Sequence, residues 1–160
     1  MKTAEQWFAE YDESHRHPTN KRVHWVCVPA ILFSTIALFW CVPIPFVTKF
    51  MPEPFQLWAN MAIPLVLGAL IFYFRISTSI FVGMFFVASL ALFASFLLST
   101  LQNPPLWALA LGLFVVAWIG QFWGHKVEGK KPSFLKDLQF LFVGPAWVLA
   151  VLYRRWNIPI

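Results

Sequence analysis

The stretch ISTSIFVGMFFVASLALFASFLLST, residues 76–100, contains no charged residue. A helix needs about 20 consecutive, mostly apolar residues to cross the hydrocarbon core of a bilayer, and this stretch is long enough. Three other apolar blocks of comparable length lie at residues 25–47, 57–74 and 106–123. The sequence therefore predicts an all-α fold, a polytopic membrane helix bundle with four to five membrane helices.

The rest of the sequence is consistent with a single membrane domain, residues 1–160. Hydrophobic residues make up 59% of the chain and charged residues 12%, whereas soluble domains carry about 25% charged residues. A shorter apolar stretch at residues 138–152 contains Gly144-Pro145. We expect it to span with a kink, to re-enter the membrane or to lie at the interface. The segment at residues 1–24 is expected to form a short interfacial helix and a turn.

The N-terminal segment carries signals for helix ends. Thr3 and Gln6 have the spacing of a helix-capping box. Pro18 disfavours a helical conformation at the residue before it, so the first helix should end there. Thr19 or Asn20 is expected to cap the helix that follows.

Basic residues mark one side of the predicted bundle. Lys and Arg concentrate in loops that face the cytoplasm. Here they collect before the first span and after the fourth, whereas the first loop has only Lys49 and residues 102–105 have none. We therefore expect a cytoplasmic N-terminus, in a bacterial inner membrane or, in a eukaryote, in the endoplasmic reticulum. The net charge of +5 is expected to meet anionic membrane lipids and no nucleic acid.

All four histidines fall at this predicted cytoplasmic face. His15, His17 and His24 lie before the first span, and His125 follows the fourth. Neutral imidazoles bind iron, zinc, copper and nickel, so the four residues are candidate metal ligands. A histidine-rich site without thiolates or many carboxylates would suit iron(II) or zinc. The alternative is that they are interfacial histidines, bonded to lipid head groups and loop carbonyls.

Polar residues with helical spacing accompany the candidate ligands. Gln121 lies one turn before His125, and Glu128 lies three residues after it, so either could fix the orientation of that ring. Tyr11 lies four residues before His15, on the same helical face. The alternative for the cluster at residues 121–128 is an ordinary helix end whose polar side chains lie at the membrane surface.

Several other chemistries lack their motifs in this sequence. It has no glycine-rich phosphate loop, no G-x-S-x-G nucleophile elbow and no HExxH motif. The predicted spans hold almost no ionisable residues, which argues against a transporter of protons or ions.

Two sets of residues carry a resemblance to a known family. They read Tyr11-x3-His15-x2-Pro18-x-Asn20-x3-His24-x4-Pro29 and Trp118-x2-Gln121-Phe122-x-Gly124-His125, the second followed by Glu128 and Pro132. The chain resembles the membrane 2-hydroxy fatty acid dioxygenases, whose characterised fungal members depend on iron(II) and act in phytosphingosine breakdown. The likeness covers nearly the whole chain.

The resemblance implies a metal, a substrate and a set of residues. It implies Fe2+ held by His15, His24 and His125, with His17, water or substrate as a fourth ligand. It also implies that four neighbours orient the ligands or the substrate: Tyr11, Asn20, Gln121 and Glu128. The implied substrates are a long-chain 2-hydroxy fatty acid and O2. Cleavage between C1 and C2 would leave a fatty acid one carbon shorter.

Two other functions fit the same sequence. One is a membrane zinc hydrolase acting on lipids, in which the metal activates water. The other is a non-catalytic membrane protein that binds lipid or assists assembly, and it predicts tolerance of every His→Ala change. Oligomer formation stays open. We predict the dioxygenase, because the placement of the histidines and the family motifs agree.

Overall fold

The structure is a computed structural model that describes residues 2–101, 103–129 and 134–160. Its elements are α1 (Ala4–Asp12), α2 (Pro18–Trp40), α3 (Pro45–Thr48), the 3-10 helix η1 (Glu53–Trp58), α4 (Ala62–Ile76), α5 (Thr78–Ser99), α6 (Leu106–Glu128) and α7 (Phe134–Arg155). The described residues form no strand, so the predicted all-α fold is confirmed.

Within the described residues, three helices are long and apolar enough to cross a membrane, namely α2, α5 and α6, and α4 is a shorter apolar helix. Their outer faces carry large hydrophobic side chains. Leu90 on α5 and Val116 on α6 are 69% and 66% exposed. Apolar faces of this extent would be a liability in water, and they suit contact with lipid. The chain therefore forms a membrane helix bundle.

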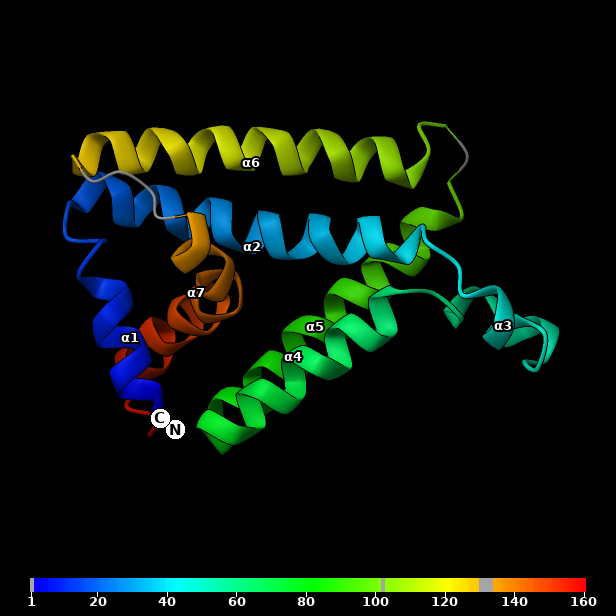
Figure 1. Ribbon diagram of the computed structural model, residues 1–160, viewed down its shortest axis with the longest axis horizontal. Helices are drawn as coiled ribbons and strands as arrows, with labels where there is room; N and C mark the ends of the chain where they lie inside the picture. The colour runs from blue at the N-terminus through cyan, green and yellow to red at the C-terminus, as the bar shows by residue number, and fades with distance from the viewer. Residues whose placement is uncertain (1, 102, 130–133) are drawn as a thin grey trace.

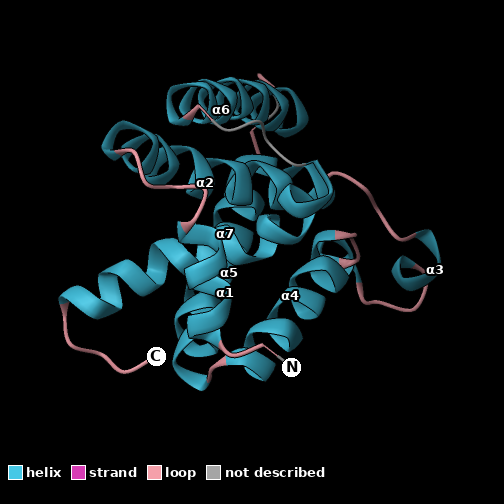
Figure 2. Ribbon diagram, turned by 60° about the vertical axis from the view of Figure 1, so that its left-hand side comes forward, coloured by secondary structure: helices cyan, strands magenta, loops and turns pink. Residues whose placement is uncertain are grey.

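Two antiparallel helix pairs frame the bundle, α2 with α6 and α4 with α5 (Figure 1). The pairs lie close together at one end and diverge toward the other. The helices α1 and α7 lie in the opening between the diverging ends, and both chain termini are found there (Figure 1). Figure 2, turned by 60°, shows α6 stacked over α2 and α3 projecting from the bundle.

Local sequence explains where the first two helices begin. The predicted capping box is present at the start of α1. The second helix begins at Pro18, and its N-cap is His17, whose Nδ1 accepts a hydrogen bond from the Thr19 backbone N–H at 3.1 Å. Proline is favoured in the first helical turn because its missing N–H is not needed there. The expectation that Thr19 or Asn20 caps this helix was therefore wrong.

The first apolar block is divided between a helix and a connection. The block runs to residue 47, whereas α2 ends at Trp40 with Cys41 as its C-cap. Proline follows at positions 43 and 45 and cannot continue an α-helix without losing a backbone hydrogen bond. The chain then forms α3 and η1 before α4 begins at Ala62.

Glycines let α2 and α6 approach closely. A Cβ atom added at Gly120 would lie 2.6 Å from Cys27 Sγ, and one at Gly124 would lie 2.5 Å from Asn20 Oδ1. Both distances are too short for real contacts, so a larger residue would displace the facing side chain or separate the helices. Small residues serve the same purpose in other membrane helix pairs. The close packing brings His24 of α2 alongside the end of α6.

A buried hydrophobic cluster packs α7 against its neighbours. Phe8 of α1, Ile80 of α5 and Trp147 of α7 are almost completely buried in one core. Pro145 interrupts the backbone hydrogen bonding within α7. One turn earlier, the Tyr73 hydroxyl of α4 donates to the Phe142 carbonyl at 2.8 Å. This region of α7 forms one wall of the site described next.

Candidate metal centre

Three histidines from separate parts of the chain meet inside the bundle. His15 lies in the turn between α1 and α2, His24 lies on the second turn of α2, and His125 lies near the end of α6. Each offers one ligand atom, and these atoms all lie within 4.8 Å of one another. The ring centroids are 4.2 Å apart for His15 and His24, and 5.0 Å apart for His24 and His125. This group could hold a metal ion.

Backbone carbonyls orient two of the three rings. His15 Nδ1 lies 2.6 Å from the Tyr11 carbonyl, and His24 Nδ1 lies 3.0 Å from the Asn20 carbonyl. A carbonyl can only accept, so each Nδ1 carries the proton and donates it. The opposite nitrogen, Nε2, then keeps a free lone pair, as in many metal-binding histidines. His15 Nε2 is buried without a hydrogen-bond partner, as a ligand atom awaiting a metal would be.

Burial also sets the charge of the first histidine. Desolvation lowers the pKa of His15 to about 4, and the neighbouring His125 acts in the same direction. His15 is therefore neutral at physiological pH. Neutral imidazole is the form that binds metals, so the electrostatics and the geometry agree.

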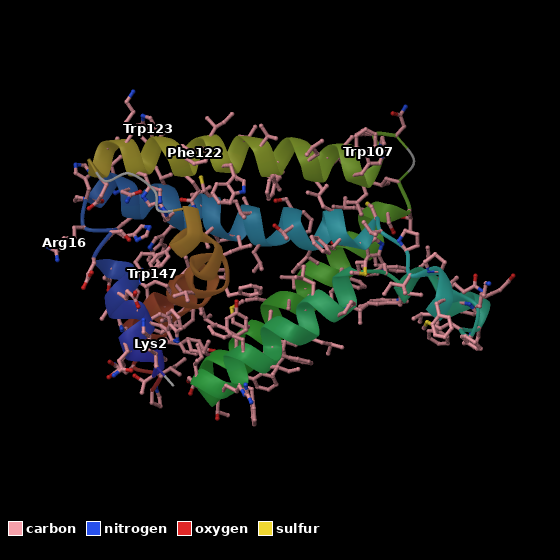
Figure 3. The ribbon with its side chains drawn as sticks, in the orientation of Figure 1. Lys2, Arg16, Trp107, Phe122, Trp123 and Trp147 are labelled. Atoms are coloured by element: carbon pink, nitrogen blue, oxygen red, sulfur yellow. The ribbon has the colours of Figure 1, made fainter. Side chains whose placement is uncertain are left out.

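Tyr11 holds His15 from one side. Its ring stacks on the His15 ring with centroids 4.0 Å apart and an interplanar angle of 6°. The tyrosine ring also lies 5.2 Å from Trp147 of α7, which rests against α1 (Figure 3). Trp147 Nε1 in turn donates a hydrogen bond to Asp12 Oδ1 at 3.1 Å. The first and last helices therefore fix the rotamer of His15 together.

Glu128 ties the end of α6 to the turn that carries His15. Its carboxylate accepts hydrogen bonds from the backbone N–H groups of Arg16 and His17, both at 2.8 Å. It also accepts one from Asn20 Nδ2 at 3.1 Å. Charged acceptors form strong hydrogen bonds with backbone donors near a helix N-terminus. Glu128 therefore acts on the backbone around the histidines, and Arg16 itself points away from the bundle (Figure 3).

His17 lies outside the three-histidine group. Its Nδ1 accepts the Thr19 N–H and caps α2. The histidine that the sequence left as a possible fourth ligand therefore has a different local contact. Three imidazoles leave coordination positions on a metal ion free for small ligands.

A cavity opens beside the three histidines. It contains about 540 Å³ of space free of atoms, including space open to solvent. Its lining combines the histidines with apolar side chains of α2, α6 and α7: Tyr11, His15, His24, Val28, Ile31, Leu32, Trp118, Gln121, Phe122, His125, Leu141 and Pro145. Gln121 Oε1 and Trp118 Nε1 are buried there without hydrogen-bond partners. They could bind the polar end of a ligand.

The structure brings most of the predicted site residues together. Tyr11 and Gln121 line the cavity with the three histidines. Glu128 accepts from the backbone N–H groups of Arg16 and His17, and Asn20 Nδ2 donates to the same carboxylate. Sequence reasoning missed the contact of Asp12 with Trp147. Its only sequence signals are an acidic residue next to Tyr11 and a tryptophan two residues after the Gly144-Pro145 pair.

Comparison with known proteins identifies one family. A family described as "Mpo1-like: 2-hydroxy-palmitic acid dioxygenase Mpo1-like" matches residues 1–156. No curated protein and no solved structure matches the chain. The match covers every element of the fold and all three histidines of the metal centre.

Proposed function

The chain belongs to the Mpo1-like family of 2-hydroxy-palmitic acid dioxygenases, and from this premise we propose an iron(II)-dependent oxidation of long-chain 2-hydroxy fatty acids. The reaction breaks the bond between C1 and C2. A 2-hydroxy acid and O2 give a fatty acid one carbon shorter, CO2 and water. These products balance the reactants, so the reaction needs no external reductant.

One observation carries the proposal beyond the family name. The three buried histidines lie at a cavity whose other walls are mostly apolar. A bound iron(II) would supply the electronic coupling that lets O2 react with an organic substrate, chemistry that amino-acid side chains lack. His15, His24 and His125 would hold the ion, and imidazole is among the ligands that suit iron.

The protein's own groups would bind and orient the substrate head. Gln121 and Trp118 place an unpartnered acceptor and an unpartnered donor in the cavity. The indole N–H can donate to the substrate carboxylate, and the Gln121 carbonyl can accept from the 2-hydroxyl group. Binding a substrate that satisfies both groups removes the cost of leaving them buried and unpaired. The apolar walls keep bulk water from the reacting carbon.

We also propose that the site faces the cytoplasm. The turn between α1 and α2, the end of α6 and both termini lie at the open end of the bundle (Figure 1). Basic residues collect at the same end, including Arg154 and Arg155 in the last turn of α7, as they do on cytoplasmic faces. A C-terminal fluorescent protein that matures only in the cytoplasm should be bright, and a dark fusion at normal expression would reverse the orientation.

Oxygen uptake with product analysis tests the function. Detergent-purified protein loaded with iron(II) should consume O2 when given 2-hydroxyhexadecanoic acid. Pentadecanoic acid and CO2 should appear in equal amounts. Zinc-loaded protein should bind the acid and consume no O2. Folded, iron-loaded protein that consumes no O2 would contradict the proposal. Hydrolysis of lipid esters by the zinc form would then favour a membrane hydrolase, and inertness of both forms a non-catalytic lipid-binding protein.

A further inference from the structure

A second cavity lies next to the metal centre. It contains about 530 Å³ of space free of atoms. Its lining comes from α2, α4, α5 and α7: Leu32, Thr35, Ile36, Leu65, Val66, Ala69, Leu70, Tyr73, Met84, Ala88, Leu141 and Phe142. Leu32 and Leu141 line the histidine cavity as well. The two cavities are therefore neighbours separated by these two side chains.

The second cavity is suited to hydrocarbon. None of the described residues that line it is charged. The Tyr73 hydroxyl donates to the Phe142 carbonyl at 2.8 Å and so has its partner. Thr35 Oγ1 is buried without one, so it offers a single weak polar contact. A cavity with this lining favours an apolar ligand over water, because water there would find few hydrogen-bond partners.

The proposed substrate has the matching shape. Its polar head needs the histidine cavity, and its long apolar tail must leave that cavity through a wall. Leu32 and Leu141 are the lining residues common to both cavities. The adjoining cavity offers the apolar surroundings that the tail requires. The first cavity has polar groups in its lining and suits the tail less well.

We propose that the acyl chain passes between Leu32 and Leu141 into the second cavity, where Met84 and Ala88 on α5 limit its length. This inference rests on the proposed function for the identity of the head group. Both α5 residues line only the second cavity, and both are buried. They line the second cavity from α5, whereas the two shared leucines come from α2 and α7. A larger residue on this wall shortens the space for the tail, and a smaller one lengthens it.

Substitution of Ala88 provides the first test. Ala88→Leu replaces the methyl side chain on this wall with an isobutyl group and should displace the terminal methylenes of the longest acids. Each methylene that loses its place should weaken binding about fourfold. Dissociation constants are measured under anaerobic conditions with iron-loaded protein, for 2-hydroxydodecanoic through 2-hydroxyoctadecanoic acid. We expect the affinity of the long acids to fall while that of the shortest stays unchanged.

Two further variants complete the design. Ala94→Leu makes the same change at a half-buried position of α5 that lines neither cavity, and it should keep the wild-type length profile. Met84→Ala enlarges the second cavity and should move the preferred length upward. Equal length profiles in wild type, Ala88→Leu and Met84→Ala would overturn the proposal. If Ala88→Leu fails to fold, the profile of Met84→Ala decides alone.

The binding experiment separates this inference from the proposed function. Length-dependent binding that shifts with Met84 and Ala88, in a protein that consumes no O2, supports the acyl site and refutes the dioxygenase. Oxygen consumption with a length profile that ignores both residues supports the dioxygenase and refutes the acyl site.

Discussion

The histidine cavity and the apolar cavity are alike in size, about 540 and 530 Å³, and they share two leucines, yet they treat polar atoms in opposite ways. The first keeps unpartnered ring, amide and indole atoms at its lining, whereas the second has one unpartnered hydroxyl. Unpaired buried polar groups cost free energy. Their concentration in one cavity indicates that a polar ligand belongs there.

The two cavities also differ in where their residues lie along α2. His24 and Val28 line the first, Thr35 and Ile36 line the second, and Leu32 lines both. One helix thus carries a polar end and an apolar end within a single span. Under the two proposals above, reaction and chain recognition belong to successive turns of one helix, and the predictions below test this division.

The largest expected effect is the loss of His24. The side chain is 1% exposed, and its ring centroid lies 4.2 Å from that of His15 and 5.0 Å from that of His125. His24→Ala should reduce turnover of 2-hydroxyhexadecanoic acid to background, because two imidazoles hold iron poorly. The turnover of the variant is measured as oxygen uptake in the presence of this acid. Full activity in this variant would place the reaction elsewhere in the molecule.

The next effect concerns the carboxylate that holds the polar cavity together. Glu128→Gln keeps the size of the side chain but replaces one acceptor oxygen with a donor, so the contacts to Arg16 and His17 cannot both persist. Loss of such outer contacts weakens metal affinity by about 10- to 100-fold. A competitive metal titration measures this, with Glu53→Gln on exposed η1 as the control. Equal affinities would remove Glu128 from the site.

Close packing of α2 and α6 predicts a smaller effect on stability. Gly124→Ala places a Cβ 2.5 Å from Asn20 Oδ1, and overpacking of this kind costs about 1–3 kcal/mol in the free energy of unfolding. Gly112→Ala on the same helix meets no atom within 4 Å and should be neutral or stabilising, because alanine favours helices. Unfolding experiments in detergent compare the free energies of unfolding of the two variants. Equal destabilisation would mean that the close approach has no energetic role.

The smallest effect is expected in the apolar cavity. Thr35→Val replaces an unpartnered buried hydroxyl with a methyl group and should stabilise the fold by about 1 kcal/mol. Ser34→Ala is the contrasting variant, because the Ser34 hydroxyl donates to the Ala30 carbonyl at 2.7 Å. It should destabilise by about 1 kcal/mol. Metal affinity should not change in either. A destabilising Thr35→Val would show that the hydroxyl has a partner.

The hydrophobic blocks and the uneven distribution of Lys and Arg between the loops were enough to predict much of this arrangement. The stretch at 76–100 coincides closely with α5 (Thr78–Ser99), because a long apolar run bounded by polar residues has few alternatives. Counting crossings placed His24 and His125 at one face, and the structure brings them together with His15. The family resemblance is confirmed as well.

Other features depend on helix rotation and packing, which a single sequence does not encode locally. Nothing near Glu128 in the sequence indicates that it accepts N–H groups more than a hundred residues earlier. His17 is the N-cap because the helix begins at Pro18. The sequence pointed to Thr19 instead, because threonine is a preferred N-cap residue. The apolar cavity is formed by side chains from four separate helices. No sequence motif predicts it, because it depends on how these helices pack.

Metal content per chain tests the central claim most directly. Protein incubated with iron(II) under anaerobic conditions, desalted and analysed by elemental mass spectrometry should carry about one ion per chain. The variants His15→Ala, His24→Ala and His125→Ala should each carry almost none. His17→Ala, which removes a neighbouring histidine outside the group, should keep the wild-type content. Wild-type content in all three variants, or its loss only in His17→Ala, would contradict the account.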